Sequence, residues 1–243
     1  MLIIALNKIF RIDVISSNCI TMNPKQLAGE KAVEFVREGM IVGLGTGSTA
    51  YFSIKKIGKL VQDGFRLKAV CTSQATHDLA VSLGISVLEM QEVDHIDLTI
   101  DGADEVDPDG HGIKGRWGAL LFEKIVAINS DKNIWVVDEN KIVKKLGKFP
   151  LPVEVIPFGY RQVLDYFAQM GFNPVLRKDD GEIFQTDSRN YIIDLHLGAI
   201  EDPVELNRTI NQVTGVVENG LFPGIVNKVI VADHNNTRIL EFR

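Results

Sequence analysis

The sequence predicts an open α/β fold, in which a parallel sheet carries helices on both faces, followed by a smaller α+β unit. Apolar strand-like segments alternate with helical segments up to about residue 146, a pattern typical of a parallel sheet. Polar side chains follow each predicted strand, and ligands of open α/β sheets bind beyond the carboxyl ends of the strands. Later residues instead form closely spaced short segments with turn signals between them.

The first predicted elements are a helix, a strand and a second helix. Asn23 is a suitable N-cap, and Pro24 fits the first turn of a helix that we expect to run through residues 34–37. Residues 41–44 are a short apolar run, which indicates a buried strand. A helix is expected over residues 51–61.

Glycine and hydroxyl residues form the turn between this strand and this helix. Residues 41–50 read I-V-G-L-G-T-G-S-T-A. Such a turn lets backbone N–H groups approach an anion at a helix N-terminus, so it predicts a phosphate site. It is neither a dinucleotide fingerprint, because Ser48 stands where the third glycine belongs, nor a P-loop, because no Gly-Lys-Ser/Thr follows. The alternative is a turn that only packs strand against helix.

Charged residues cluster in residues 101–123, which read D-G-A-D-E-V-D-P-D-G-H-G-I-K-G-R-W-G-A-L-L-F-E. Apolar residues alternate with polar ones over residues 96–101, so a strand is expected to end at Asp101. The set Asp101, Asp104, Lys114 and Glu123 could bind a polar substrate, move a proton and stabilise an oxyanion. The alternative is a solvated acidic turn followed by a surface helix.

A helix is predicted after Gly118, with Glu123 on a partly apolar face. Ala119, Val126 and Ala127 share that face at helical spacing. Partial burial there raises the pKa of a carboxyl group. A base that abstracts a proton benefits from such a shift.

The remaining elements complete the sheet and form the second unit. A strand at residues 134–137 precedes Asp138 and Lys141, and a strand at 229–232 returns to the first unit. The proline-punctuated stretch 148–157 is interpreted as a crossing between domains. In the second unit, helices are expected at 161–170 and 203–212, strands at 174–177, 182–186 and 191–197, and a turn at 179–181.

These segments together resemble the A type of ribose-5-phosphate isomerase, from about Lys25 to the C-terminus. The resemblance rests on I-V-G-L-G-T-G-S-T-A, D-G-A-D-E-V-D, I-K-G, G-A-L-L, E-K-I-V-A, L-G-K-F-P-L-P-V-E-V-I-P and G-V-V-E-N-G-L-F. It implies a Rossmann-like catalytic domain (residues 22–146 and 219–243) and a small ferredoxin-like α+β domain (residues 147–218). It also implies a homodimer, in some members a tetramer.

The resemblance further implies a role for each site residue. Glu123 matches the general base, Asp101 the acid that helps to open the furanose ring, and Asp104 and Lys114 the groups around the C1 and C2 oxygens. The residues matched to substrate binding are Lys25, Thr46, Gly47, Ser48, Thr49 and Lys141.

The implied reaction interconverts D-ribose 5-phosphate and D-ribulose 5-phosphate in the non-oxidative pentose phosphate pathway. The ring opens, a proton leaves C2, a cis-enediolate forms, and the proton returns to C1. This chemistry requires no metal and no organic cofactor. The five histidines (His77, His95, His111, His196, His234) are scattered without metal-ligand spacing. His111 lies near the acids, but we interpret it as a loop residue rather than a ligand.

Two residues depart from the family pattern. Family members usually have glycine at the position of Trp117 and commonly arginine at that of Phe122. We expect the Trp117 indole to lie at the rim of the pocket, because Lys114 must face the substrate and the helix begins near Gly118. Phe122 is expected to serve helix packing.

Composition limits the classes of partner and compartment. The net charge is −6, and the sequence contains no block of basic residues that would indicate binding to nucleic acid. Cys19 and Cys71 are the only cysteines, which fits a reducing cytoplasm. Residues 1–21 lie outside the resemblance; they are too short and too interrupted by charge for a membrane span. The status of this N-terminal extension is left open.

Two other classes of function were weighed. A sugar-phosphate sensor would need a DNA-binding module, for which the residues before Met22 are too few. An amino-sugar phosphate deaminase or an acyl-CoA transferase would use a similar fold. A deaminase is expected to use a histidine in ring opening, and Asp101 stands in that position.

Overall fold

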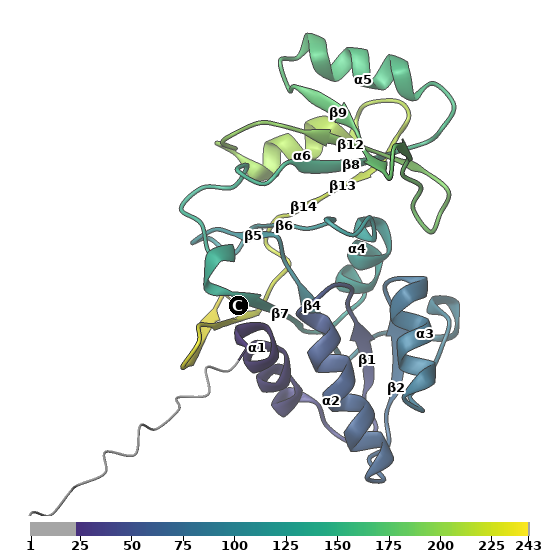
Figure 1. Ribbon diagram of the computed structural model, residues 1–243, viewed down its shortest axis with the longest axis vertical. Coiled ribbons are helices and arrows are strands. Elements are labelled where there is room, and N and C mark those ends of the chain that lie inside the picture. Colours follow the sequence, from purple (N-terminus) through teal and green to yellow (C-terminus); the bar gives the residue numbers. More distant parts are fainter. Residues whose placement is uncertain (1–22, 243) are drawn as a thin grey trace, which may run out of the picture.

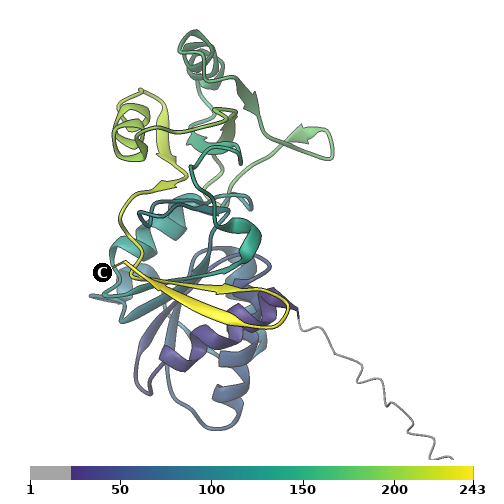
Figure 2. The same ribbon diagram turned by 90° about the vertical axis from the view of Figure 1, so that its left-hand side faces the viewer.

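The computed structural model describes residues 23–242. The predicted extension 1–21, Met22 and Cys19 lie outside the described residues. The chain forms a large lobe around one sheet and a smaller lobe above it, as two perpendicular views show (Figures 1 and 2). None of the helices in residues 23–242 has the length and apolar character to cross a membrane.

The large lobe contains a seven-stranded sheet of order β16-β15-β7-β4-β1-β2-β3. All neighbouring strands are parallel except β15 and β16, which are antiparallel. The strands are β1 (Ile41–Leu44), β2 (Lys68–Cys71), β3 (Ser86–Val87), β4 (Leu98–Gly102), β7 (Asn133–Asp138), β15 (Lys228–Ala232) and β16 (Thr237–Glu241). The chain order reverses between β1 and β4, and ligands of such sheets bind outside the carboxyl ends at that reversal.

Helices cover both faces of this sheet, as predicted. Val42, Leu44 and Ile100 point into a core shared with α1 (Pro24–Ala32), α2 (Ala50–Gln62) and α3 (Gln74–Ser82). The other face packs against α4 (Leu120–Ile128) through residues such as Val70, Val126, Ala127 and Trp135. Strands buried on both faces read as continuous apolar runs, which is why residues 41–44 were recognisable.

The small lobe is an antiparallel sheet of order β13-β8-β12-β9 with two helices. Its elements are β8 (Leu151–Val155), α5 (Tyr160–Gln169), β9 (Pro174–Leu176), β12 (Tyr191–Leu195), α6 (Pro203–Asn211) and β13 (Val216–Asn219). This βαββαβ sequence with its strand order is ferredoxin-like, in agreement with the expected class. A short hairpin, β10 (Lys178–Asp179) with β11 (Glu182–Ile183), extends from β9.

A third sheet, of order β14-β6-β5, lies between the two lobes. It consists of β5 (Glu105–Val106), β6 (Gly112–Ile113) and β14 (Leu221–Phe222). Lys114 follows β6 directly, so this sheet fixes where the lysine leaves the backbone. Three single-turn helices complete the structure: η1 (Val33–Phe35), η2 (Met90–Glu92) and η3 (Glu139–Lys141).

Several predicted boundaries were wrong. The first helix ends at Ala32 and continues only as the η1 turn, which ends at Phe35 and so stops before Arg37. The stretch 148–157 is not merely a crossing, because it contains β8 at the centre of the small sheet. The strand expected at 182–186 ends at Ile183. β3, β5, β6, β10, β13, β14 and β16 were not predicted: all of these except β13 and β16 have two residues each, and the exposed alternation of β16 is weak.

Candidate active site

The turn after β1 is shaped around two glycines. A Cβ atom added to Gly45 would fall 2.0 Å from Oδ1 of Asp101, so only glycine allows this approach. Gly47 has a φ of 114°, a conformation that side chains disfavour. The N–H of Thr46 donates to Oδ1 of Asp101 at 3.1 Å. The turn therefore lies against the acidic end of β4.

A cation and the start of α2 meet beside this turn. Nζ of Lys25, from α1, donates to Oγ of Ser48 at 2.9 Å. Thr49 is the N-cap of α2 and its side chain makes no capping bond. N–H groups in the first turn of a helix have no helical acceptors. An ammonium, a hydroxyl group and these N–H groups can together bind a phosphate.

The hydroxyl group of Thr46 faces protein rather than the open cavity. Its Oγ1 atom lies 2.7 Å from Oγ1 of Thr72, donates to Oγ of Ser73 at 2.8 Å and lies 3.2 Å from Oγ1 of Thr76. These hydroxyl groups join the turn after β1 to the start of α3. Polar residues that follow β1 and β2 are thus brought together, with Thr46 bracing the turn.

Asp101, Lys114 and Glu123 form a buried charged group. Nζ of Lys114 lies 2.7 Å from Oδ2 of Asp101 and 3.3 Å from Oε1 of Glu123, and it donates to the carbonyl of Gly102 at 2.5 Å. The side chains of these three residues are at most 5% exposed. Oε2 of Glu123 is buried and has no hydrogen-bond partner among residues 23–242. One ammonium therefore serves two carboxylates, and one carboxylate oxygen remains free to accept a proton.

The two carboxylates have different surroundings. Burial, followed by repulsion from Asp101, raises the pKa of Glu123 to about 8. Burial also raises the pKa of Asp101, but Lys114 and the N–H groups of Gly102 and Thr46 oppose the rise. Burial alone would lower the pKa of Lys114, yet the carboxylates Asp101 and Glu123 outweigh it and raise the pKa. Glu123 is therefore the group of the three best placed to exchange a proton near neutral pH.

Asp104 is held by a neighbour that sequence reasoning missed. Nε of Arg116 lies 3.0 Å from Oδ1 of Asp104, and the backbone N–H of Arg116 donates to Oδ2 at 3.0 Å. The guanidinium group of Arg116 stacks over Phe149, 4.5 Å from the ring centre. Its proximity to Lys114 in the sequence was the available signal. Arg116 lines the same cavity as the predicted residues.

Every predicted site residue except Asp101 lines one cavity of about 470 Å³. Asp101 lies behind Lys114, at the floor of the site. Lys141 enters from η3, beyond the carboxyl end of β7. The same cavity is therefore lined both by the turn that can bind a phosphate and by the charged pair of Glu123 and Lys114.

Trp117 lies at the mouth of this cavity, the position expected from the sequence. Its side chain is exposed (58%) and packs over Gly47, whose added Cβ atom would lie 2.9 Å from the indole. Trp117 also borders a second, more apolar cavity of about 680 Å³ that includes Phe52 and Phe184. Phe122 is half-buried and lines neither cavity.

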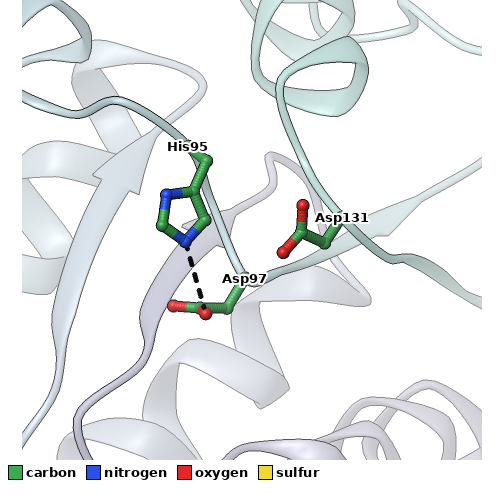
Figure 3. A group of neighbouring side chains, drawn as sticks. All are labelled: His95, Asp97 and Asp131. Carbon is green, nitrogen blue, oxygen red and sulfur yellow. Dashed lines mark ion pairs between the residues drawn. The ribbon is translucent and has the colours of Figure 1, made fainter.

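The histidines near acidic groups lie away from this chemistry. Nδ1 of His111 accepts a hydrogen bond from the N–H of Gly224 at 3.1 Å, which ties two loops together. Within residues 23–242, His95, Asp97 and Asp131 form a group with metal-compatible spacing, which the sequence analysis missed (Figure 3). These residues precede β4 and β7, so they lie at the amino ends of the strands, whereas Asp101 lies near the carboxyl end of β4. Asp97 there accepts a hydrogen bond from the N–H of Ile41 at 2.7 Å.

Comparisons with known proteins agree with this geometry. Residues 68–236 match the family model described as ribose 5-phosphate isomerase A (phosphoriboisomerase A). The ribose-5-phosphate isomerase A of Streptococcus gordonii is 51% identical over 220 residues, which cover 90% of this chain and 98% of that protein. That of Levilactobacillus brevis is 53% identical over 221 residues, 90% of this chain and 97% of that protein.

Solved structures give the same result. Ribose 5-phosphate isomerase A from Methanocaldococcus jannaschii aligns with a TM-score of 0.85 and 39% identity, covering 89% of this chain and 97% of that chain. A D-ribose-5-phosphate isomerase in complex with phospho-erythronic acid aligns with a TM-score of 0.87 and 36% identity, covering 90% of this chain and all of that chain.

Proposed function

The chain belongs to the ribose 5-phosphate isomerase A family and interconverts ribose 5-phosphate and ribulose 5-phosphate, and we propose that Glu123 carries the proton between C2 and C1. The observation that carries this assignment is the buried Oε2 atom of Glu123, which has no partner. It belongs to a carboxyl group whose pKa burial raises to about 8. A base with a pKa near the working pH is effective both in taking a proton and in returning it.

Lys114 stabilises the enediolate that forms after proton removal. Its ammonium group is buried between two carboxylates, beside the proposed base. In a site with little water, a fixed positive charge stabilises a developing oxyanion by several kcal/mol, roughly 3 for one well-placed donor. Asp101 supports ring opening from behind Lys114, because it holds the ammonium where it faces the sugar oxygens.

The phosphate binds at the other end of the cavity. Ser48, Thr49 and the backbone at Gly47 supply donors, and Lys25 supplies charge. Lys141 extends the positive charge along the same wall. The relative solved with phospho-erythronic acid binds a phosphorylated acid, which supports a phosphate subsite here. Asp104, held by Arg116, lines the same cavity, where it would contact the sugar hydroxyl groups.

The test of the proton carrier is Glu123→Gln. The amide keeps the shape of the side chain but cannot accept a proton, so turnover should fall by at least the roughly 10²–10⁴-fold typical of a positioned acid–base group. Exchange of the C2 hydrogen with D₂O, followed by NMR, should stop as well. Near-wild-type turnover would assign the base to another residue.

Glu154→Gln is the matched control. Glu154 is also buried, has a raised pKa because of burial, and has an Oε2 atom without a partner. It lies on β8, outside the catalytic cavity, where Thr186 and Asn190 donate to it. Its variant should keep its turnover. An equal loss in both variants would show that a buried amide disturbs the fold rather than the chemistry.

We further propose a domain division, an assembly and a compartment. Residues 22–146 with 219–243 would form the catalytic domain and residues 147–218 the small one. The separate sheets support that division. Family membership supports a homodimer, and the unpaired thiol of Cys71 is consistent with a reducing cytoplasm.

A further inference from the structure

The loop that carries Lys114 has an unusual backbone. Gly115 and Gly118 have φ values of 113° and 78°. The N–H of Lys114 donates to the carbonyl of Gly220 at 2.9 Å, and the N–H of Gly118 donates to that of Gly115 at 3.0 Å. Glycines allow this path but do not enforce it, since they are the most flexible residues. Something outside the loop must fix its shape.

Asp104 binds the N–H and Nε of Arg116 from one side, and Arg177, from the small lobe, makes further contacts that fix the loop from the other side. Its Nη1 atom donates to the carbonyls of Gly115 at 2.8 Å and Arg116 at 3.1 Å. Nε and Nη2 of the same guanidinium group bind the two carboxylate oxygens of Asp194, at 2.9 and 2.5 Å. The side chains of Arg177 and Asp194 are only 13% and 17% exposed. A planar fork held on two sides leaves the guanidinium little freedom.

A second contact from the same segment covers the far end of the loop. The N–H of Phe184 donates to the carbonyl of Arg177 at 3.1 Å, which fixes the two residues relative to each other. The ring of Phe184 lies against Gly118, where an added Cβ atom would fall 2.4 Å from it. The loop 114–118 is thus held at one end by hydrogen bonds and at the other by an aromatic ring.

We propose that Arg177 is a positioning residue for isomerisation: with Asp194 as its anchor, it holds the loop 114–118 so that Lys114 stays beside Glu123. It does not line the catalytic cavity, so it acts through the loop and not on the sugar. This proposal rests on the proposed function of Lys114 and Glu123. It gives the small lobe a part in catalysis, although no proposed catalytic side chain belongs to that lobe.

The test replaces Arg177 with Met and with Lys in the full chain. Met keeps the length of the side chain and removes every donor, and we expect kcat to fall roughly 10²-fold, the loss that a displacement of about 1 Å can cause. KM should stay within about threefold, because the phosphate turn makes no contact with Arg177. Lys retains a charge and a donor, so it should restore part of kcat. Arg208→Met is the control, since Arg208 forms an exposed pair with Glu205 on α6.

A second measurement reports on the loop without any turnover. Trp117 lies in the loop, and Trp135→Phe removes the other tryptophan signal. In that background, acrylamide should quench the Trp117 fluorescence more strongly in Arg177→Met, because a loosened loop exposes the indole. If Arg177→Met does not fold, Asp194→Asn, which only loosens the anchor, should show the same loss of kcat and the same accessibility in smaller measure. Unchanged kcat in a folded variant, or a rise in KM alone, would overturn the proposal. If Arg177→Met alters the accessibility of Trp117 but Glu123→Gln is active, the loop is held as proposed and the assignment of Glu123 as proton carrier is wrong.

Discussion

The charges of Asp101, Lys114 and Glu123 are taken out of water together, which sets the chemistry of the site. Two carboxylates and one ammonium leave one negative charge in excess when all are ionised. Asp101 has the shorter contact with Lys114 and two N–H donors, while Glu123 has one longer contact. A proton that neutralises this excess negative charge therefore binds mainly to Glu123. The same imbalance that makes Glu123 costly to ionise makes it suitable as a proton carrier.

The pH dependence of turnover should follow from this imbalance. Glu123 accepts a proton only when ionised, and burial raises its pKa to about 8. We expect kcat/KM to rise about tenfold per pH unit below that value and to level off above it. The apparent pKa belongs to Glu123 and Asp101 together, because the two groups interact. Initial rates from about pH 6 to about pH 9 check it, and a flat profile would contradict a proton on Glu123 at neutral pH.

The free energy of unfolding should also depend on the ionisation of Glu123, but it should fall with rising pH where kcat/KM rises. A carboxyl group whose folded pKa lies above its unfolded pKa stabilises the fold fully below the unfolded value, and this contribution is lost as the pH rises to the folded value. For Glu123 the window runs from 4.5, the ordinary pKa of a glutamate, to about 8. The slope is at most ~1.4 kcal/mol per pH unit. Urea unfolding across this window should show wild type losing stability relative to Glu123→Gln, whose side chain does not titrate. Parallel curves would contradict the raised pKa.

Trp117 is one of the two residues at which the sequence analysis found a departure from the family pattern. The indole lies over Gly47 and between the two cavities, where it can shield a bound sugar phosphate from water. We expect Trp117→Gly to bind substrate equally well or more weakly. In a Trp135→Phe background, sugar phosphate should quench the Trp117 fluorescence of an otherwise wild-type chain. A large gain in kcat/KM for Trp117→Gly would instead show that the indole obstructs the site.

At the scale of elements, α1 and α2 meet at the proposed phosphate subsite. Asn23 caps α1, which places Lys25 in its first turn, and the side chain then reaches Ser48 at the start of α2. Capping and helix packing thus place a cation that lies far from the glycine turn in the sequence. Propensity rules predicted both helix starts, whereas only the family resemblance indicated that Lys25 and the turn before α2 would lie together.

Lys25→Ala should therefore weaken binding more than chemistry. We expect KM for ribose 5-phosphate to rise by roughly tenfold, which corresponds to ~1.4 kcal/mol, with a smaller change in kcat. Steady-state kinetics with Lys31→Ala as control measure it, because Lys31 is on the same helix and pairs only with Glu34. An unchanged KM, or a ligand-bound structure with the phosphate away from this turn, would refute the assignment.

Local sequence patterns predicted helices and strands well where the buried residues form a regular pattern along the chain. The apolar run of β1 and the glycine turn after it were recognisable because each has a local physical cause. The alternation over residues 96–101 was less informative, since Thr99 and Asp101 are as buried as Leu98 and Ile100. In the middle of a parallel sheet both faces are covered, so a polar residue there indicates a function or a partner and not solvent.

At the scale of the whole molecule, the parts that the sequence did not predict are contacts between distant segments. Arg116 binds Asp104 through a loop whose path depends on two glycines, and Arg177 reaches that loop from the other lobe. No local period encodes such pairs, because their partners are chosen by the packing of the two lobes. The resemblance supplied residue roles, whereas the structure supplied the supports of those residues.

Independence from metal ions is a prediction about the molecule as a whole. Proton transfer by Glu123 and charge stabilisation by Lys114 leave no step for a divalent ion, so activity should survive exhaustive treatment with EDTA. Ions held by His95, Asp97 and Asp131 would be removed too, but that group lies at the opposite edge of the sheet. Its loss should change the melting temperature at most, since Asp97 fixes the backbone of Ile41 through a direct hydrogen bond. The measurement is turnover and thermal unfolding before and after chelation, with Asp131→Asn separating the two effects. Inactivation by EDTA that a divalent ion reverses in both proteins would require Asp104 and its neighbours to be ligands.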